Sequence, residues 1–145
     1  LVGISKNTPQ IEGGHFDLDQ NGEPLGIFRE NAMNFILNKI PEPTVDELKE
    51  IILKASENAL KEGITSIQTN DWENIENVIS AYTSLKESNN LPVRIYEQFS
   101  LPKISNLKDF IEKGYKTGHG DEFFKFGPLK LFVDGSLGAR TAFLN

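Results

Sequence analysis

The sequence predicts an α/β protein in which a parallel sheet follows an N-terminal β-hairpin. Helical and strand patterns alternate from residue 44 onward, an order typical of βαβ units with right-handed crossovers. An Asn-Gly pair at 21–22 stands between two short strand-like runs and predicts the hairpin. The stiff sequence "PEP" at 41–43 separates the two regions. We therefore predict a hairpin and short-helix subdomain over 1–43 and a helix–strand segment over 44–145.

The first region is rich in turn-forming residues, and its two strands are predicted near 14–19 and 24–30. Pro24 places the second strand at a sheet edge, because proline cannot donate to a hydrogen-bond ladder. The stretch "NAMNFILNKI" at 31–40 predicts a short helix that ends before Pro41.

The second region begins with the helix that has the clearest signals, predicted over 45–62. Thr44 and Glu47 have the spacing of a capping box, and Gly63 suits the position after the helix, where φ is positive. The remaining elements are predicted as strand 64–68, helix 71–88, strand 92–99, helix 105–114 and strand 128–135, with a polar loop at 117–127.

Composition excludes several classes of function. The chain of 145 residues has a net charge of −6, so it has no basic surplus with which to bind nucleic acid or an anionic membrane. It has no apolar run long enough to span a membrane. It has no cysteine, which excludes disulfides and thiolate ligands. We expect no nucleic-acid or membrane partner, and a cytoplasmic location is the default.

Lys130 stands out because it lies within the apolar run "PLKLFV" of the last predicted strand. In a strand covered on both faces, desolvation would lower the lysine pKa and expose a neutral amine. Such an amine could form a Schiff base, act as a base, or add CO2 to become a metal-ligating carbamate. The alternative is a structural lysine that reaches solvent or pairs with a carboxylate, and the strand pattern alone favours this alternative.

The motif "DGSLGAR" at 134–140 follows that strand. It could form a nest of backbone amides that binds an anion. It could equally be a strand-to-loop turn in which Gly135 and Gly138 supply positive φ. The candidate ligand-binding residues of this motif are Asp134, Ser136 and Arg140.

Other polar residues offer weaker signals. His15 and His119 are the only histidines, and neither lies in a metal-binding spacing, so the chain encodes no complete histidine-based metal site. Asn70 and Asp71 end the first strand of the parallel sheet, where ligands bind in such folds. Capping of the following helix explains both residue types equally well.

Three stretches together carry a family resemblance. Residues 3–32 contain G-I-x-x-x-T-P-x-x-x-G-G, then D-x-x-G-E-P-x-G, then E-N-A; residues 62–71 read "EGITSIQTND", and residues 127–142 read "GPLKLFVDGSLGARTA". In this order, over nearly the whole chain, they resemble the YtcJ-like, or amidohydrolase-3, metal-dependent hydrolases. The resemblance implies a partial (β/α)8 TIM-type barrel holding about strands 2–4, with the N-terminal β-hairpin as an insertion.

The resemblance also implies a function. The family hydrolyses C–N bonds of small amide-type molecules with a water activated by a divalent metal, expected to be zinc. Lys130 matches the strand-4 position at which a lysine, often carboxylated, ligates the metal. Asp134, Ser136 and Arg140 would then bind substrate. The family's H-x-H, its later histidines and its last aspartate have no match in this sequence.

We therefore expect an internal fragment of a longer hydrolase, cut at both ends, which holds no metal, carries an unmodified Lys130 and is inactive by itself. The open edges of its sheet predict self-association. Two alternatives remain: a self-contained α/β module that binds an anion or small ligand through 134–140, and a regulatory or interaction domain without chemistry.

Overall fold

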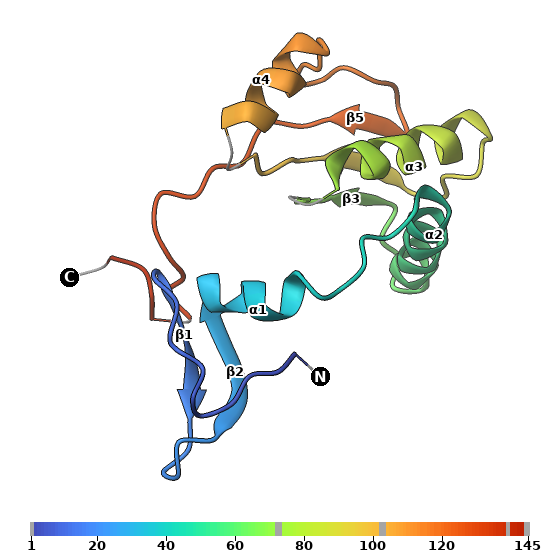
Figure 1. Ribbon diagram of the computed structural model, residues 1–145. Coiled ribbons are helices and arrows are strands. Elements are labelled where there is room, and N and C mark those ends of the chain that lie inside the picture. Colours follow the sequence, from blue (N-terminus) through green and yellow to red (C-terminus); the bar gives the residue numbers. More distant parts are fainter. Residues whose placement is uncertain (1, 72–73, 102–103, 139, 144–145) are drawn as a thin grey trace. The chain divides into compact units, whose positions relative to one another are not determined.

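The structure, a computed structural model, describes residues 2–71, 74–101, 104–138 and 140–143 (Figure 1). These residues form two compact units, one from residues 1–41 and 133–145 and the other from residues 42–132. No helix among the described residues combines the length and apolar character that a membrane crossing requires. The division into subdomains 1–43 and 44–145 stays a prediction for the longer protein.

The first unit contains the predicted antiparallel hairpin, which is confirmed. Strands β1 (Gly14–Leu18) and β2 (Pro24–Glu30) pair in antiparallel register, with an irregularity between Phe16 and Leu18. The Asp19 carboxylate holds the turn, because its Oδ1 atom accepts the backbone amides of Asn21 and Glu23, each at 2.8 Å. A 3-10 turn, η1 (Asn31–Met33), and one turn of helix, α1 (Asn34–Leu37), replace the longer helix predicted over 31–40.

A small aromatic core holds this unit together. Phe16 is buried on the inner face of β1, and its ring lies 5.8 Å from that of Phe28 and 6.1 Å from that of Phe35. Ala32, in the 3-10 turn, is also fully buried. The unit therefore packs β2 and α1 around one phenylalanine.

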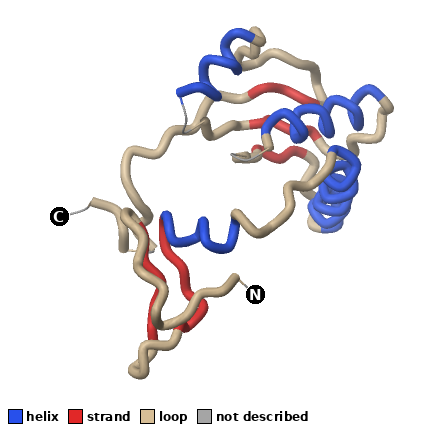
Figure 2. The backbone as a smooth tube through the Cα atoms, in the orientation of Figure 1, coloured by secondary structure: helices blue, strands red, loops and turns tan. Residues whose placement is uncertain are grey.

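The second unit has the predicted alternation of helices and strands. Its elements are α2 (Val45–Lys61), β3 (Ser66–Gln68), α3 (Ile75–Glu87), β4 (Arg94–Glu97), α4 (Ile104–Glu112) and β5 (Phe124–Phe126). The three strands form one parallel sheet in the order β3-β4-β5 (Figure 2). The fold is thus mixed α/β, with a three-stranded parallel sheet and a separate hairpin.

The third strand begins earlier than predicted, and the prediction of a strand over 128–135 is wrong. The run "FFKF", assigned to a loop, forms β5, because Phe124 and Phe126 are buried and pair beside β4, while Lys125 is exposed. Within 128–135 only Lys130 pairs, through an isolated bridge to Ser100. The residues after it have no strand partner and are exposed, although they are apolar.

Aromatic packing between the sheet and its helices forms the core of this unit. Tyr82 of α3 stacks on Phe124 at 5.2 Å between ring centroids. Phe99, which is fully buried, lies 5.4 Å from Phe110 of α4 and 6.1 Å from Phe126. This face of the sheet is called the core face below.

The capping box predicted for α2 is present. Thr44 Oγ1 accepts the Glu47 amide at 3.3 Å, and Glu47 Oε2 accepts the Thr44 amide at 2.8 Å. Loss of the cap in Thr44→Ala is expected to lower the free energy of unfolding by about 1 kcal/mol, because the helix amide loses its acceptor. Urea denaturation monitored by circular dichroism measures it. Thr44→Ser, which keeps the hydroxyl, is the control and should stay close to wild type; equal losses in both variants would contradict the capping role.

Candidate functional site

Lys130 lies at the carboxyl end of the parallel sheet. Beyond the named strands, isolated parallel bridges join Asp71 to Phe99 and Ser100 to Lys130. The Lys130 amide donates to the carbonyl of Phe99 at 2.8 Å. These bridges continue the pairing of β3, β4 and β5 past their carboxyl ends, which is where ligands bind in parallel α/β folds.

Strand alternation places Lys130 on the face of the sheet opposite the core face. Neighbouring residues of an extended chain point to opposite faces, and residues paired across strands share a face. Phe99 is in the core, so Ser100 and its partner Lys130 lie on the other face, together with the exposed side chains of Gln68 and Lys125. We call this the polar face.

The surroundings of Lys130 are partly apolar. The side chain is half-buried, and its Nζ atom makes a cation–π contact with Phe132, 5.0 Å from the ring centroid. Among the described residues, no ion pair joins it to a carboxylate. The structure therefore does not contain the ion pair considered as a structural role for this lysine.

The "DGSLGAR" motif belongs to the hairpin unit. The Ser136 amide donates to Thr141 Oγ1 at 2.9 Å, and the Thr141 hydroxyl donates to Glu30. Asp134 Oδ2 accepts the Phe143 amide at 3.0 Å. The motif is thus a folded loop tied to the end of β2.

The glycines of this motif act differently from the prediction. Neither Gly135 nor Gly138 has positive φ, which in this loop occurs at Arg140. Gly135 is needed for space, because a Cβ atom there would lie 2.3 Å from the carbonyl oxygen of Thr141. The prediction that both glycines supply positive φ is wrong.

A cavity of about 510 Å³ lies beside the motif within the hairpin unit. Glu30 and Asp134 contribute carboxylates to its lining, together with His15, whereas Ser136 and Arg140 are not among its lining residues. Two carboxylates disfavour a bound anion, so the cavity gives no support to the anion-binding alternative.

The two histidines lie in different units and have other contacts. His15 Nε2 lies 3.1 Å from Asp17, which also binds Arg29 at 2.7 Å; the hydrogen bond from Arg29 lowers the pKa of Asp17 below its ordinary value. The exposed His119 stacks on Phe126. No group of three or more histidine or acidic side chains that could hold a metal occurs in the part of the chain that the structure describes. These residues therefore do not fit a metal ion by themselves.

A buried polar cluster around Glu97, at the end of the central strand β4, was not predicted from the sequence. Glu97, on the core face, is fully buried, and neither of its carboxylate oxygens has a hydrogen-bond partner among the described residues. Burial, with a smaller contribution from the nearby Asp71 carboxyl, raises the pKa of Glu97 to about 9, and the Thr69 hydroxyl acts in the opposite direction. Burial, Glu97 and Asp71 also raise the pKa of Tyr82.

The sequence contained a signal for this cluster. In "RIYEQF" the alternation that buries Ile95 and Phe99 also buries Glu97. The capping role proposed for Asn70 or Asp71 is wrong, because α3 begins at Ile75 with Asn74 at its N-cap. Asp71 is instead free to face the buried cluster.

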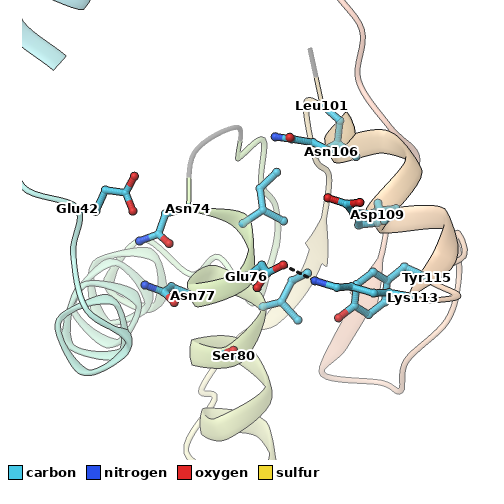
Figure 3. A pocket seen from close by; sticks show the side chains of 13 residues that line it. Glu42, Asn74, Glu76, Asn77, Ser80, Leu101, Asn106, Asp109, Lys113 and Tyr115 are labelled. Atoms are coloured by element: carbon cyan, nitrogen blue, oxygen red, sulfur yellow. Dashed lines mark hydrogen bonds and ion pairs between the residues drawn. The ribbon is translucent and has the colours of Figure 1, made fainter. Parts of the chain in front are cut away.

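A cavity of about 590 Å³ in the second unit lies between α3 and α4 (Figure 3). Its lining is mostly polar, and an ion pair between Glu76 and Lys113 spans it. The hydrogen bond to Glu76 raises the pKa of Lys113. None of the residues singled out from the sequence lines this cavity.

Comparison with known proteins connects these features to a family. A family model described as "Amidohydrolase family" matches residues 1–145. YtcJ of Bacillus subtilis (strain 168), an amidohydrolase by name, is 28% identical over 146 residues, which cover 99% of this chain and 26% of YtcJ. The protein LONG AFTER FAR-RED 3 of Arabidopsis thaliana is 29% identical over 154 residues, covering 98% and 25%.

Two solved structures are similar in fold. A metal-dependent hydrolase from Pyrococcus furiosus matches 93% of this chain with a TM-score of 0.61 and 27% identity. One from Pyrococcus horikoshii OT3 matches 93% with a TM-score of 0.59; at 22% identity it supports the fold alone. The match covers 26% of each of these chains, so this chain spans about a quarter of the length of its relatives.

Proposed function

Because the chain belongs to the amidohydrolase family, we propose that it is a segment of a longer, metal-dependent hydrolase that cleaves C–N bonds of small amide-type molecules. The family match over residues 1–145 and the similarity to metal-dependent hydrolases support this proposal. The three parallel strands would be about strands 2–4 of a (β/α)8 barrel with the hairpin as an insertion. The full-length protein would be cytoplasmic.

The position of Lys130 carries the proposal. It lies on the polar face at the carboxyl end of the sheet, where the active sites of (β/α)8 barrels are built. We propose that it becomes carboxylated and ligates a divalent metal, zinc, in the full-length protein. Such a metal, when bound, acidifies a water molecule. The other ligands would lie outside residues 1–145, because the described residues form no metal site alone.

Two further assignments complete the proposal. Asp134, Ser136 and Arg140 would contact the substrate in the full-length protein. The chain of residues 1–145 would be inactive alone and would associate with itself, because the sheet order β3-β4-β5 leaves β3 and β5 at open edges.

Metal removal tests the proposed function. The full-length protein is expected to hydrolyse members of a panel of N-acyl amines and amides, to lose at least about 100-fold in kcat/KM after dialysis against a chelator, and to recover with Zn²⁺. The chain of residues 1–145, assayed beside it, should show no hydrolysis. Full activity after verified metal removal would contradict metal dependence, and hydrolysis of matched esters without any amide would contradict the C–N assignment.

A further inference from the structure

A cavity of about 200 Å³ lies under α2 at the edge of the parallel sheet. Its apolar wall includes Ile51 and Ile52 of α2 and Ile67 of β3. Its polar residues include Thr69 and Asp71, which follow β3. The cavity thus combines an apolar wall with an acidic residue, Asp71.

The acidic part of this cavity lacks a positive charge. Of the two acidic residues here, only Asp71 lines the cavity, and Glu97 lies beside Asp71, fully buried. Among the described residues, neither the carboxylate oxygens of Glu97 nor the buried Thr69 Oγ1 atom has a hydrogen-bond partner. Among the described residues, neither Asp71 nor Glu97 takes part in an ion pair. Buried carboxylates are costly unless a cation or a proton neutralises them. A cation that reaches Asp71 would supply this neutralisation in place of a proton.

The cavity also lies at an unfinished border of the sheet. Strand β3 pairs only with β4, so its other edge is open in the described sheet. Ile51, which lines the cavity, is 56% exposed, although it is a large apolar residue beside the core. The relatives are about four times as long as this chain, so a strand and its side chains from elsewhere in the protein can cover this border.

We propose that this cavity receives a lysine or arginine side chain from the part of the full-length protein outside residues 1–145. The inference rests on the proposed function, because it requires the longer protein. The aliphatic stem of such a side chain matches the apolar wall, and its charged head matches the Asp71 carboxyl group, beside which Glu97 is buried. Asp71 is thus one half of an ion pair between segments, which fixes how the next strand joins β3.

n-Butylammonium, which has the length and charge of a lysine side chain, tests the empty site. At pH 8 and about five times its Kd, it is expected to raise the Tm of the 1–145 chain by about 3 °C, since a ligand that binds only the folded state stabilises it in proportion to ln(1 + [L]/Kd). 1-Butanol, equal in length but uncharged, should have a much smaller effect. Asp71→Asn should abolish the butylammonium shift, and Glu76→Gln, which changes an acid in the other cavity, should keep it. Equal shifts with butanol, or an undiminished shift in Asp71→Asn, would overturn the inference.

The second experiment uses the full-length protein. There Glu97→Gln is expected to lower Tm and n-butylammonium to have no effect, because the natural cation is already in place. In the 1–145 chain the same substitution should raise Tm. If Glu97→Gln changed Tm in the same direction in both proteins, the inference would be overturned. It would also be overturned if the butylammonium shift disappeared when the 1–145 chain is concentrated, since a second copy of the chain would then occupy the cavity. The butylammonium and Glu97→Gln experiments both measure Tm and not activity. A full-length protein that lacks amidase activity, but in which Glu97→Gln lowers Tm, would therefore refute only the proposed function.

Discussion

Lys130→Ala is expected to remove the metal from the full-length protein and to lower kcat/KM by more than about 100-fold. Loss of a residue that only orients a metal ligand typically costs 10–100-fold, so loss of the ligand itself should cost more. The half-buried position of Lys130 at the carboxyl end of the sheet, beyond the last paired residues of β4, suits that role. Metal content by atomic absorption and steady-state kinetics on the same preparation measure both effects.

Lys125→Ala is the matched control for this substitution. Lys125 lies on the same polar face but within β5, five residues before Lys130, and its side chain is exposed. It should retain metal and activity. In Lys130→Ala, added acetate should restore part of the activity, because a free carboxylate can replace the carbamate. A Lys130→Ala protein with full metal content and unchanged kcat/KM would refute the ligand role.

Local signals predicted the elements that local interactions form. The hairpin turn at 21–22 and the capping box of Thr44 and Glu47 depend on residues at most four apart, and both were predicted from sequence, although the role of Asp19 in the turn was not. The third strand was misplaced, because the run "PLKLFV" is more apolar than "FFKF". Pairing with β4, a long-range interaction, selects Phe124 and Phe126 instead. The sequence alone does not show which residues pair with β4, so it could not place the third strand.

The candidate site likewise contains residues that the sequence predicted and residues that it did not. Lys130 was singled out because it lies in an apolar run, and the family resemblance then implied a metal-ligand role for it; the family match is confirmed. Its location at the carboxyl end of the sheet follows from the parallel order of strands. Glu97 was missed, because a single glutamate in a strand normally faces solvent, even though its alternation with the buried Ile95 and Phe99 indicates the covered face. The hydrogen bond from Thr141 to Glu30 joins residues so distant in sequence that no motif spacing predicts it.

Glu97→Gln is expected to stabilise the 1–145 chain at pH 7 by up to about 3 kcal/mol. Burial raises the pKa of Glu97 from its ordinary value of 4.5 to about 9, so the folded chain binds this proton more tightly than the unfolded chain. Stability therefore decreases as pH rises through this window, by about 1.4 kcal/mol for each pH unit at most. Glutamine has the same shape without the charge, so it removes this dependence.

Urea denaturation at a series of pH values measures the effect. Near pH 4 both proteins hold a neutral side chain at position 97 and should unfold at similar urea concentrations. The difference should grow from about pH 5 and level off above pH 9, where the glutamate is ionised in both states. Glu50→Gln, on the exposed surface of α2, is the control and should follow wild type at each pH. If Glu97→Gln instead destabilises the chain equally at pH 4 and pH 8, the carboxyl group makes hydrogen bonds that glutamine cannot replace, and the neutral, unpaired Glu97 inferred from its burial is wrong.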